Sequence, residues 1–182
     1  MVYILLGEGF EEIEAVAPFD ILKRGGVDTV FAGVNSLEVM AAHGVAYKAH
    51  CLVSEVDLSD AEMVIIPGGM GGVECIEASG EAMALVKKAY DMGIELAAIC
   101  AGPRVLSKHG ILKGKRAVCY PGLEDQMDAG EMTQECGTIR DELLTTSRGP
   151  GTAIDFGLKV LEVLRGREIA DEVASFMHYD RR

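Results

Sequence analysis

Short apolar runs that alternate with helical patterns constrain the fold of this chain more than any other feature. Strand-like runs lie at residues 2–6, 29–34, 63–66 and 94–99, and helical patterns lie at about 11–24, 80–92 and 103–108. Strands joined by crossover helices pair in parallel, because a tight turn cannot connect two parallel strands. The sequence therefore predicts a doubly wound α/β fold, in which a mostly parallel sheet carries helices on both faces.

The remainder of the chain is expected to complete the same domain. Weaker patterns predict short edge strands near Val39 and Val45, a strand over 117–120, a hairpin over 137–147 around Arg140-Asp141, and helices over about 152–164 and 167–176. The sequence shows no internal repeat, low-complexity tract or linker. Because 182 residues match one domain, residues 1–182 are expected to form a single unit with its site at the carboxyl ends of the strands.

Charge and apolar content exclude several classes of partner. The 29 acidic side chains outnumber the 17 basic ones, so a net charge of −12 repels nucleic acids and anionic lipids. No apolar run approaches the ~20 residues that cross a bilayer, and the first residues lack a signal-peptide pattern. Five cysteines without a CxxC pair fit free thiols. We therefore expect a soluble, cytoplasmic protein that binds neither nucleic acid nor membranes.

Cys100 is the cysteine whose surroundings favour chemistry. It ends an apolar run and is followed by Ala101, Gly102 and Pro103, the last of which suits the first turn of a helix. Small neighbours permit the sharp strand-to-helix turn of a nucleophile elbow, and the helix N-terminus is expected to lower the pKa of the thiol. A buried cysteine that simply ends a strand has the same spacing, so both interpretations stand.

Glu14 is the acidic residue after the first predicted strand that is expected to point inward. It shares a helical face with Ala17 and Ile21, whereas its acidic neighbours suit solvent and the first turn of a helix. Burial among apolar groups raises the pKa of a carboxyl group. A carboxyl that holds a proton beside a thiol can serve as general acid and base.

The other candidate motifs are weaker. Pro67-Gly68-Gly69 ends another predicted strand and forms either a plain turn or backbone donors of an oxyanion site opposite the Ala101 N–H. Residues 147–152 form either a turn with a helix cap or an anion-binding nest. None of the four histidines lies beside Cys100, and the chain lacks metal-ligand spacing, a phosphate loop and a dinucleotide fingerprint. We predict no bound metal and no cofactor.

Four longer motifs occur in order along the chain. They are GEGFEEIEAV at 7–16, IIPGGMGG at 65–72, AAICAGP at 97–103 and TSRGPGTAIDFGL at 146–158. Together they resemble the ThiJ/PfpI superfamily, and in particular the branch of the parkinsonism-associated protein deglycase and its bacterial relatives. The resemblance implies a flavodoxin-like fold of the class I glutamine amidotransferase type and a homodimer.

The resemblance also implies roles for individual residues. Cys100 matches a nucleophilic, oxidation-prone cysteine, and Glu14 matches a protonated glutamate that is hydrogen-bonded to it. The backbone of Gly69 and Ala101 matches the oxyanion donors. The protease branch has a histidine at the position of Ala101, which argues against a peptidase, and Tyr120 replaces a histidine that lies near the cysteine in the human branch member. Tyr120 is therefore a candidate substrate-binding residue.

The function that the resemblance implies is that of a cysteine-dependent enzyme acting on reactive α-oxoaldehydes such as methylglyoxal and glyoxal, or on early glycation adducts. Its partners would be a small carbonyl substrate or a glycated protein. A redox-sensing stress-response protein or chaperone without small-molecule turnover is the alternative. A glutamine amidotransferase is set aside, because the chain has no His-x-Glu triplet.

The first predicted helix carries more apolar residues than one buried face requires. Ile13, Val16, Phe19 and Leu22 cover more than one side of it. One side can pack on the sheet and another on a second copy of the chain, which agrees with the implied homodimer.

Overall fold

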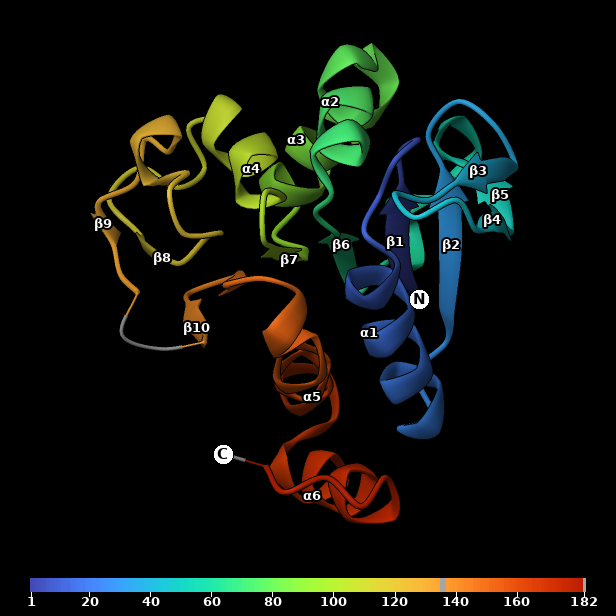
Figure 1. Cartoon of the computed structure of the whole chain (residues 1–182), viewed down its shortest axis with the longest axis vertical. Helices are drawn as coiled ribbons and strands as arrows, with labels where there is room; N and C mark the ends of the chain where they lie inside the picture. The colour runs from blue at the N-terminus through green and yellow to red at the C-terminus, as the bar shows by residue number, and fades with distance from the viewer. Residues whose placement is uncertain (135–136, 182) are drawn as a thin grey trace.

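A seven-stranded sheet forms the centre of the protein, in the order β10-β11-β7-β6-β1-β2-β5 (Figure 1). The structure is a computed structural model that describes residues 1–134 and 137–181. In sheet order, the strands span Thr138–Asp141, Leu144–Ser147, Glu95–Ile99, Met63–Ile66, Val2–Leu6, Thr29–Gly33 and Cys51–Leu52. All neighbours pair in parallel except β10 and β11, which are antiparallel. The predicted doubly wound, mostly parallel sheet is confirmed.

The central strands are buried along their whole length, which explains their continuous apolar sequences. Every residue of β1 and β6 is buried, as expected for parallel strands covered on both faces. Ile65 of β6 lies opposite Ile4 of β1 on one side and Ala97 of β7 on the other. The three strands therefore end at the same edge of the sheet.

Helices cover both faces of this sheet (Figure 1). The α-helices of the described residues are α1 (Glu12–Arg24), α2 (Met70–Ala78), α3 (Gly80–Asp91), α4 (Pro103–Lys108), α5 (Ala153–Arg165) and α6 (Arg167–Phe176). Side chains of α1, α5 and α6 share one hydrophobic cluster, and side chains of α2, α3 and α4 share the other. α1 and α5 approach closely at Gly157, where an added Cβ would lie 3.0 Å from the α-carbon of Pro18.

Helix α2 was not predicted from the sequence. Its first turn contains Gly71 and Gly72, which lower helix propensity and suggest a turn. In the structure, Gly72 instead permits close packing, because an added Cβ would lie 2.7 Å from the α-carbon of Phe10. Tertiary contact therefore overrides local propensity here.

Three predicted strand features need correction. The strands near Val39 and Val45 are β3 (Glu38–Met40) and β4 (Ala46–Lys48), which form a separate antiparallel hairpin, while β5 is the edge of the main sheet. The predicted strand at 117–120 is reduced to β8 (Arg116–Ala117), which pairs with β9 (Glu131–Met132). The β10–β11 hairpin turns after Asp141, where Glu142 has a φ of +50°.

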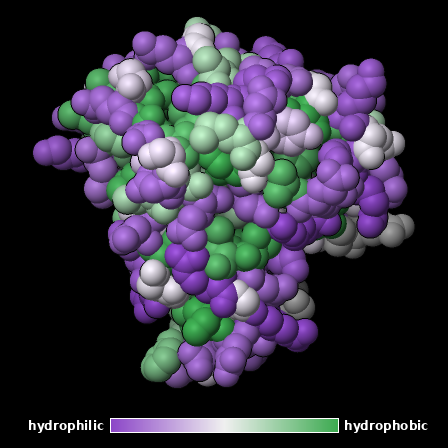
Figure 2. Space-filling model, turned by 180° about the vertical axis from the view of Figure 1, so that it is seen from behind, coloured by the Kyte–Doolittle hydropathy of each residue, from purple (hydrophilic) through white to green (hydrophobic). Residues whose placement is uncertain are grey.

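The face of the molecule seen from behind mixes hydrophilic and hydrophobic residues (Figure 2). Figure 2 shows hydrophobic residues in patches that are separated by hydrophilic ones. Among the described residues, no helix has the length and apolar character that would let it span a membrane.

Candidate active site

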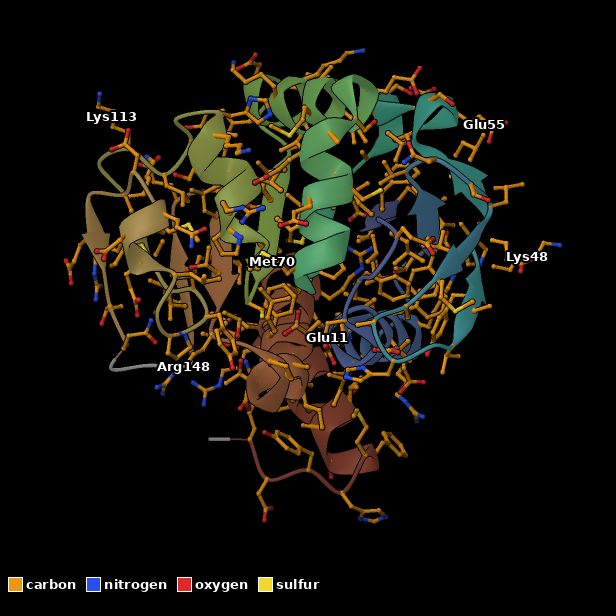
Figure 3. The ribbon with its side chains drawn as sticks, turned by 45° about the horizontal axis from the view of Figure 1, so that its top comes forward. Glu11, Lys48, Glu55, Met70, Lys113 and Arg148 are labelled. Atoms are coloured by element: carbon orange, nitrogen blue, oxygen red, sulfur yellow. The ribbon has the colours of Figure 1, made fainter. Side chains whose placement is uncertain are left out.

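The carboxyl ends of β1, β6 and β7 bring three loops together at one edge of the sheet. The loop after β1 leads into α1 with Glu14, the loop after β6 contains Gly68 and Gly69, and the loop after β7 begins with Cys100. Because the three strands are parallel neighbours, residues that are far apart in the sequence meet here. Figure 3 shows the side chains of the molecule with its top turned forward, and labels Glu11, Met70 and Arg148.

Cys100 occupies a sharp turn between β7 and α4. Its φ is +64°, in the left-handed region that side chains other than glycine rarely adopt. The turn depends on the small residues that follow, because a Cβ at Gly102 would lie 2.5 Å from the carbonyl oxygen of Ile66. The Cys100 N–H donates to the Ser147 carbonyl at 2.9 Å, which ties the turn to β11. The strained strand–turn–helix arrangement that the sequence suggested is present.

Glu14 is completely buried and lies against Cys100. Its Oε2 accepts a hydrogen bond of 2.7 Å from the Gly68 N–H. A Cβ at Gly68 would lie 2.6 Å from this oxygen and 3.0 Å from Cys100 Sγ, so the carboxyl and the thiol meet at the α-carbon of Gly68. Glu14 Oε1 is buried and has no hydrogen-bond partner among the described residues. This oxygen is therefore free to carry a proton.

The pKa values of the two side chains are raised by the same burial. Burial raises the pKa of Glu14 to about 7, although the Gly68 N–H and the Cys100 thiol lower it. Burial and the Glu14 charge raise the pKa of Cys100 to about 12. The lower thiol pKa expected from the helix N-terminus is therefore wrong, since burial outweighs the backbone dipoles. The pair therefore holds two protons below about pH 7 and one proton above it, because Glu14 releases its proton first.

Backbone N–H groups point at the sulfur from two loops. The N–H groups of Gly69 and Ala101 hydrogen-bond to Cys100 and lower its pKa. Gly69 has a φ of +81°, and a Cβ there would lie 2.5 Å from the backbone nitrogen of Glu11, so only glycine fits. These donors are placed to stabilise negative charge on an atom bonded to the sulfur.

Tyr120 lines a surface pocket and is hydrogen-bonded to the backbone of Cys100. Its backbone N–H donates to the Cys100 carbonyl at 2.9 Å, and its half-exposed ring packs near Gly149. The pocket has a volume of about 430 Å³, and its walls are Tyr120, Pro121 and residues 148–152. The phenol makes no hydrogen bond with Cys100 among the described residues, so Tyr120 stays a candidate substrate-binding residue.

A cluster next to the site was not found from the sequence. Glu11, Glu12 and His43 each place one ligand atom within 4.8 Å of the others, so these residues could hold a metal ion. His43 Nδ1 lies 2.7 Å from Glu12 Oε2, and this hydrogen bond raises the pKa of His43. An ion pair accounts for the cluster. Because His43 lies on the β3–β4 hairpin, 31 residues from Glu12, no local pattern could have revealed the contact.

Comparison with known proteins places the chain in a family. The model of the DJ-1/PfpI family matches residues 1–163. The chain belongs to the DJ-1/PfpI family. It is 35% identical to protein dj-1beta of Drosophila melanogaster over 94% of this chain and 92% of that protein, and 35% identical to glutathione-independent glyoxalase DJR-1.2 of Caenorhabditis elegans over 91% and 88%.

Solved structures support the same assignment. Oxidized DJ-1 of Toxoplasma gondii superposes with a TM-score of 0.92 at 38% identity, covering 98% of this chain and 97% of that one. Drosophila DJ-1beta gives 0.94 at 33% identity over 98% and 97%. The chain spans only 38% of Arabidopsis thaliana protein DJ-1 homolog B, to which it is 37% identical over 92% of its own length. The flavodoxin-like fold and the DJ-1 branch implied by the sequence motifs are confirmed.

Proposed function

We propose that this protein is a cysteine-dependent enzyme that converts reactive 2-oxoaldehydes such as methylglyoxal and glyoxal into 2-hydroxy acids, or removes such aldehydes from early glycation adducts. The observation that carries the proposal is the contact of a buried carboxyl, with a pKa of about 7, and the Cys100 thiol at the α-carbon of Gly68. Such a carboxyl can accept and return protons near neutral pH. The similarity to a protein named a glutathione-independent glyoxalase supports the same chemistry.

The first step is addition of the thiol to the aldehyde. The Glu14 carboxylate accepts the thiol proton while sulfur forms a bond to the aldehyde carbon. The former carbonyl oxygen becomes an oxyanion, which the N–H groups of Gly69 and Ala101 stabilise. Glu14 then returns the proton to this oxygen, which gives a neutral hemithioacetal.

The second stage moves a proton between adjacent carbons. Glu14 removes the proton from the hemithioacetal carbon to form an enediolate and delivers it to the neighbouring carbon. The hydroxyl proton passes to the adjacent oxygen, which leaves a thioester on Cys100. Water attacks the thioester, the carbon–sulfur bond breaks, and the 2-hydroxy acid leaves. The sum of the steps is addition of one water to methylglyoxal to give lactate, with no net oxidation.

The direct test is methylglyoxal consumption together with lactate formation by purified protein, without added thiols because these react with the substrate. Cys100→Ser is expected to lose nearly all activity, since a serine hydroxyl is a weaker nucleophile than a thiol and holds its proton more tightly. Cys75→Ser is the matched control, because Cys75 lies on α2 and its Sγ accepts a hydrogen bond from Asn35 instead. Equal lactate formation by the wild type and Cys100→Ser would refute the proposal.

A redox-sensing function is the second candidate. A solved relative is an oxidized DJ-1, and the N–H groups around Cys100 can donate hydrogen bonds to the oxygens of a cysteine sulfinate. A protonated Glu14 would donate a further hydrogen bond to such an oxygen. This function needs no lactate formation, so the same assay separates the two candidates.

We also propose that two copies of the chain associate through α1. Leu22 is fully buried and Phe19 stacks on Phe31, so these two residues belong to the monomer. Ile13, however, is 45% exposed and borders an apolar groove of about 450 Å³ with Val16. A second copy that covers this groove would remove the exposed apolar surface from water.

A further inference from the structure

Arg148 differs from the other arginines of the described residues because it makes no ion pair. Its side chain is exposed, and Arg148 lines the same pocket as Tyr120. The described arginines that do form ion pairs with carboxylates are Arg24, Arg104, Arg116, Arg140, Arg165, Arg167 and Arg181. In a chain with a net charge of −12, a guanidinium without a bound carboxylate stands out.

The pocket that holds Arg148 is tied to the nucleophile from two sides. Arg148 follows Ser147, whose carbonyl accepts the Cys100 N–H at 2.9 Å. Tyr120, which also lines the pocket, donates its N–H to the Cys100 carbonyl at 2.9 Å. The pocket walls are therefore fixed to the two backbone groups of Cys100.

The backbone that carries Arg148 is held firmly. Its N–H donates to the Gly137 carbonyl at 2.9 Å. The next residue, Gly149, has the Tyr120 ring 3.2 Å from the position of an added Cβ, and its carbonyl accepts a hydrogen bond of 2.8 Å from Thr152 Oγ1. The Arg148 side chain therefore extends from a backbone that is held in place where it lines the pocket.

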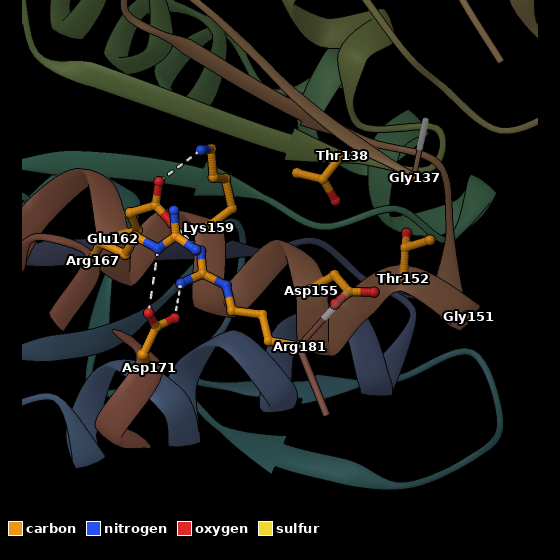
Figure 4. A pocket seen from close by; sticks show the side chains of 10 residues that line it. All are labelled: Gly137, Thr138, Gly151, Thr152, Asp155, Lys159, Glu162, Arg167, Asp171 and Arg181. Carbon is orange, nitrogen blue, oxygen red and sulfur yellow. Dashed lines mark hydrogen bonds and ion pairs between the residues drawn. The ribbon is translucent and has the colours of Figure 1, made fainter. Parts of the chain in front are cut away.

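The charges near Arg148 leave it available to a ligand. Glu124 is close enough for Arg148 to lower its pKa, but its carboxylate already accepts hydrogen bonds of 2.7 Å from the Gly122 N–H and from Gln134 Nε2. A larger hollow of about 880 Å³ near the C-terminus offers a contrast (Figure 4). There, Arg167 and Arg181 are both paired with Asp171, so no cation of this kind is free.

We propose that Arg148 is a specificity-determining residue that binds a carboxylate at the far end of the substrate, so that 2-oxoaldehydes with a carboxylate tail are preferred to neutral methylglyoxal. This inference rests on the proposed function of Cys100. A guanidinium binds a carboxylate through two parallel hydrogen bonds, which fixes direction as well as distance. A pocket of about 430 Å³ is also far larger than a three-carbon aldehyde requires.

The test compares kcat/KM for 4,5-dioxopentanoate, a 2-oxoaldehyde with a carboxylate tail, with kcat/KM for methylglyoxal. The wild type is expected to prefer 4,5-dioxopentanoate, and Arg148→Gln should reduce the preference about 10- to 100-fold, mainly through KM, as for a lost hydrogen bond to a charged group. Arg148→Lys should keep part of the preference, because lysine retains the positive charge but cannot form the two parallel hydrogen bonds of a guanidinium. Arg116→Gln is the control, since Arg116 pairs with Glu131 on the surface. An unchanged preference in Arg148→Gln would overturn the proposal.

A binding measurement separates this inference from the proposed function. Calorimetry of 2-hydroxyglutarate with Cys100→Ser needs no turnover. Weaker binding after the additional change Arg148→Gln would support the carboxylate site even if the protein converts no aldehyde. In that case the proposed function would be wrong and the carboxylate site would stand. Equal binding with and without Arg148 would overturn the carboxylate site even if methylglyoxal is converted.

Discussion

Replacing Glu14 with glutamine should change how the stability of the protein depends on pH. The folded protein raises the pKa of Glu14 from 4.5 to about 7. Between these values the folded state keeps a proton that the unfolded state has released, so the stability from this group is complete below about pH 4.5 and is lost as pH rises through 7. A difference of 2.5 pKa units corresponds to about 3 kcal/mol of unfolding free energy.

The assay is urea unfolding followed by circular dichroism from about pH 4.5 to pH 8, because the chain contains no tryptophan. Paired carboxylates such as Glu62, whose pKa Arg165 lowers to about 2, titrate in both proteins. The difference between the wild type and Glu14→Gln therefore isolates Glu14. We expect the stability of the wild type to fall by about 3 kcal/mol relative to the variant across this range. Parallel stability curves would refute the buried, raised-pKa carboxyl.

Three further changes follow from the packing of the site and of α1. Gly68→Ala should abolish turnover and cost about 1–3 kcal/mol of stability, since its Cβ would overlap Cys100 and Glu14, and normal activity in this variant would disprove the contact. Ile13→Asp should convert a dimer into a 19.4 kDa monomer in light scattering, whereas a monomeric wild type would reject the α1 interface. Graded peroxide should oxidise Cys100 before the buried Cys119, and mass spectrometry showing the reverse order would count against the sulfinate site.

Much of the fold and of the candidate site could be predicted because the relevant signals are local. Alternating apolar runs and helical patterns identify a parallel sheet, and the residues at strand ends then lie at one edge. Small residues after Cys100 indicate the sharp turn, and the helical spacing of Glu14 with Ala17 and Ile21 indicates burial. These signals depend on neighbouring positions in the sequence and on the rule that the carboxyl ends of parallel strands lie at one edge of the sheet.

The features that could not be predicted depend on contacts across the fold. The pKa of Cys100 is raised by burial and by the negative charge of Glu14, and no local sequence pattern measures either effect. Gly68 was expected either to form a plain turn or to supply an oxyanion donor. Instead, its N–H donates to Glu14, and its α-carbon lies against the side chains of Glu14 and Cys100. Helix α2 forms despite its glycines because Gly72 packs on Phe10.

The pH dependence of kcat/KM for methylglyoxal tests the Cys100–Glu14 pair most directly. The active form carries one proton on the pair, and it makes no kinetic difference which of the two atoms holds that proton. Since Glu14 has a pKa of about 7 and Cys100 a pKa of about 12, kcat/KM should rise about tenfold per pH unit below 7 and stay level above it. A profile that levels off only above about pH 8.5, as for an isolated cysteine, would contradict the account.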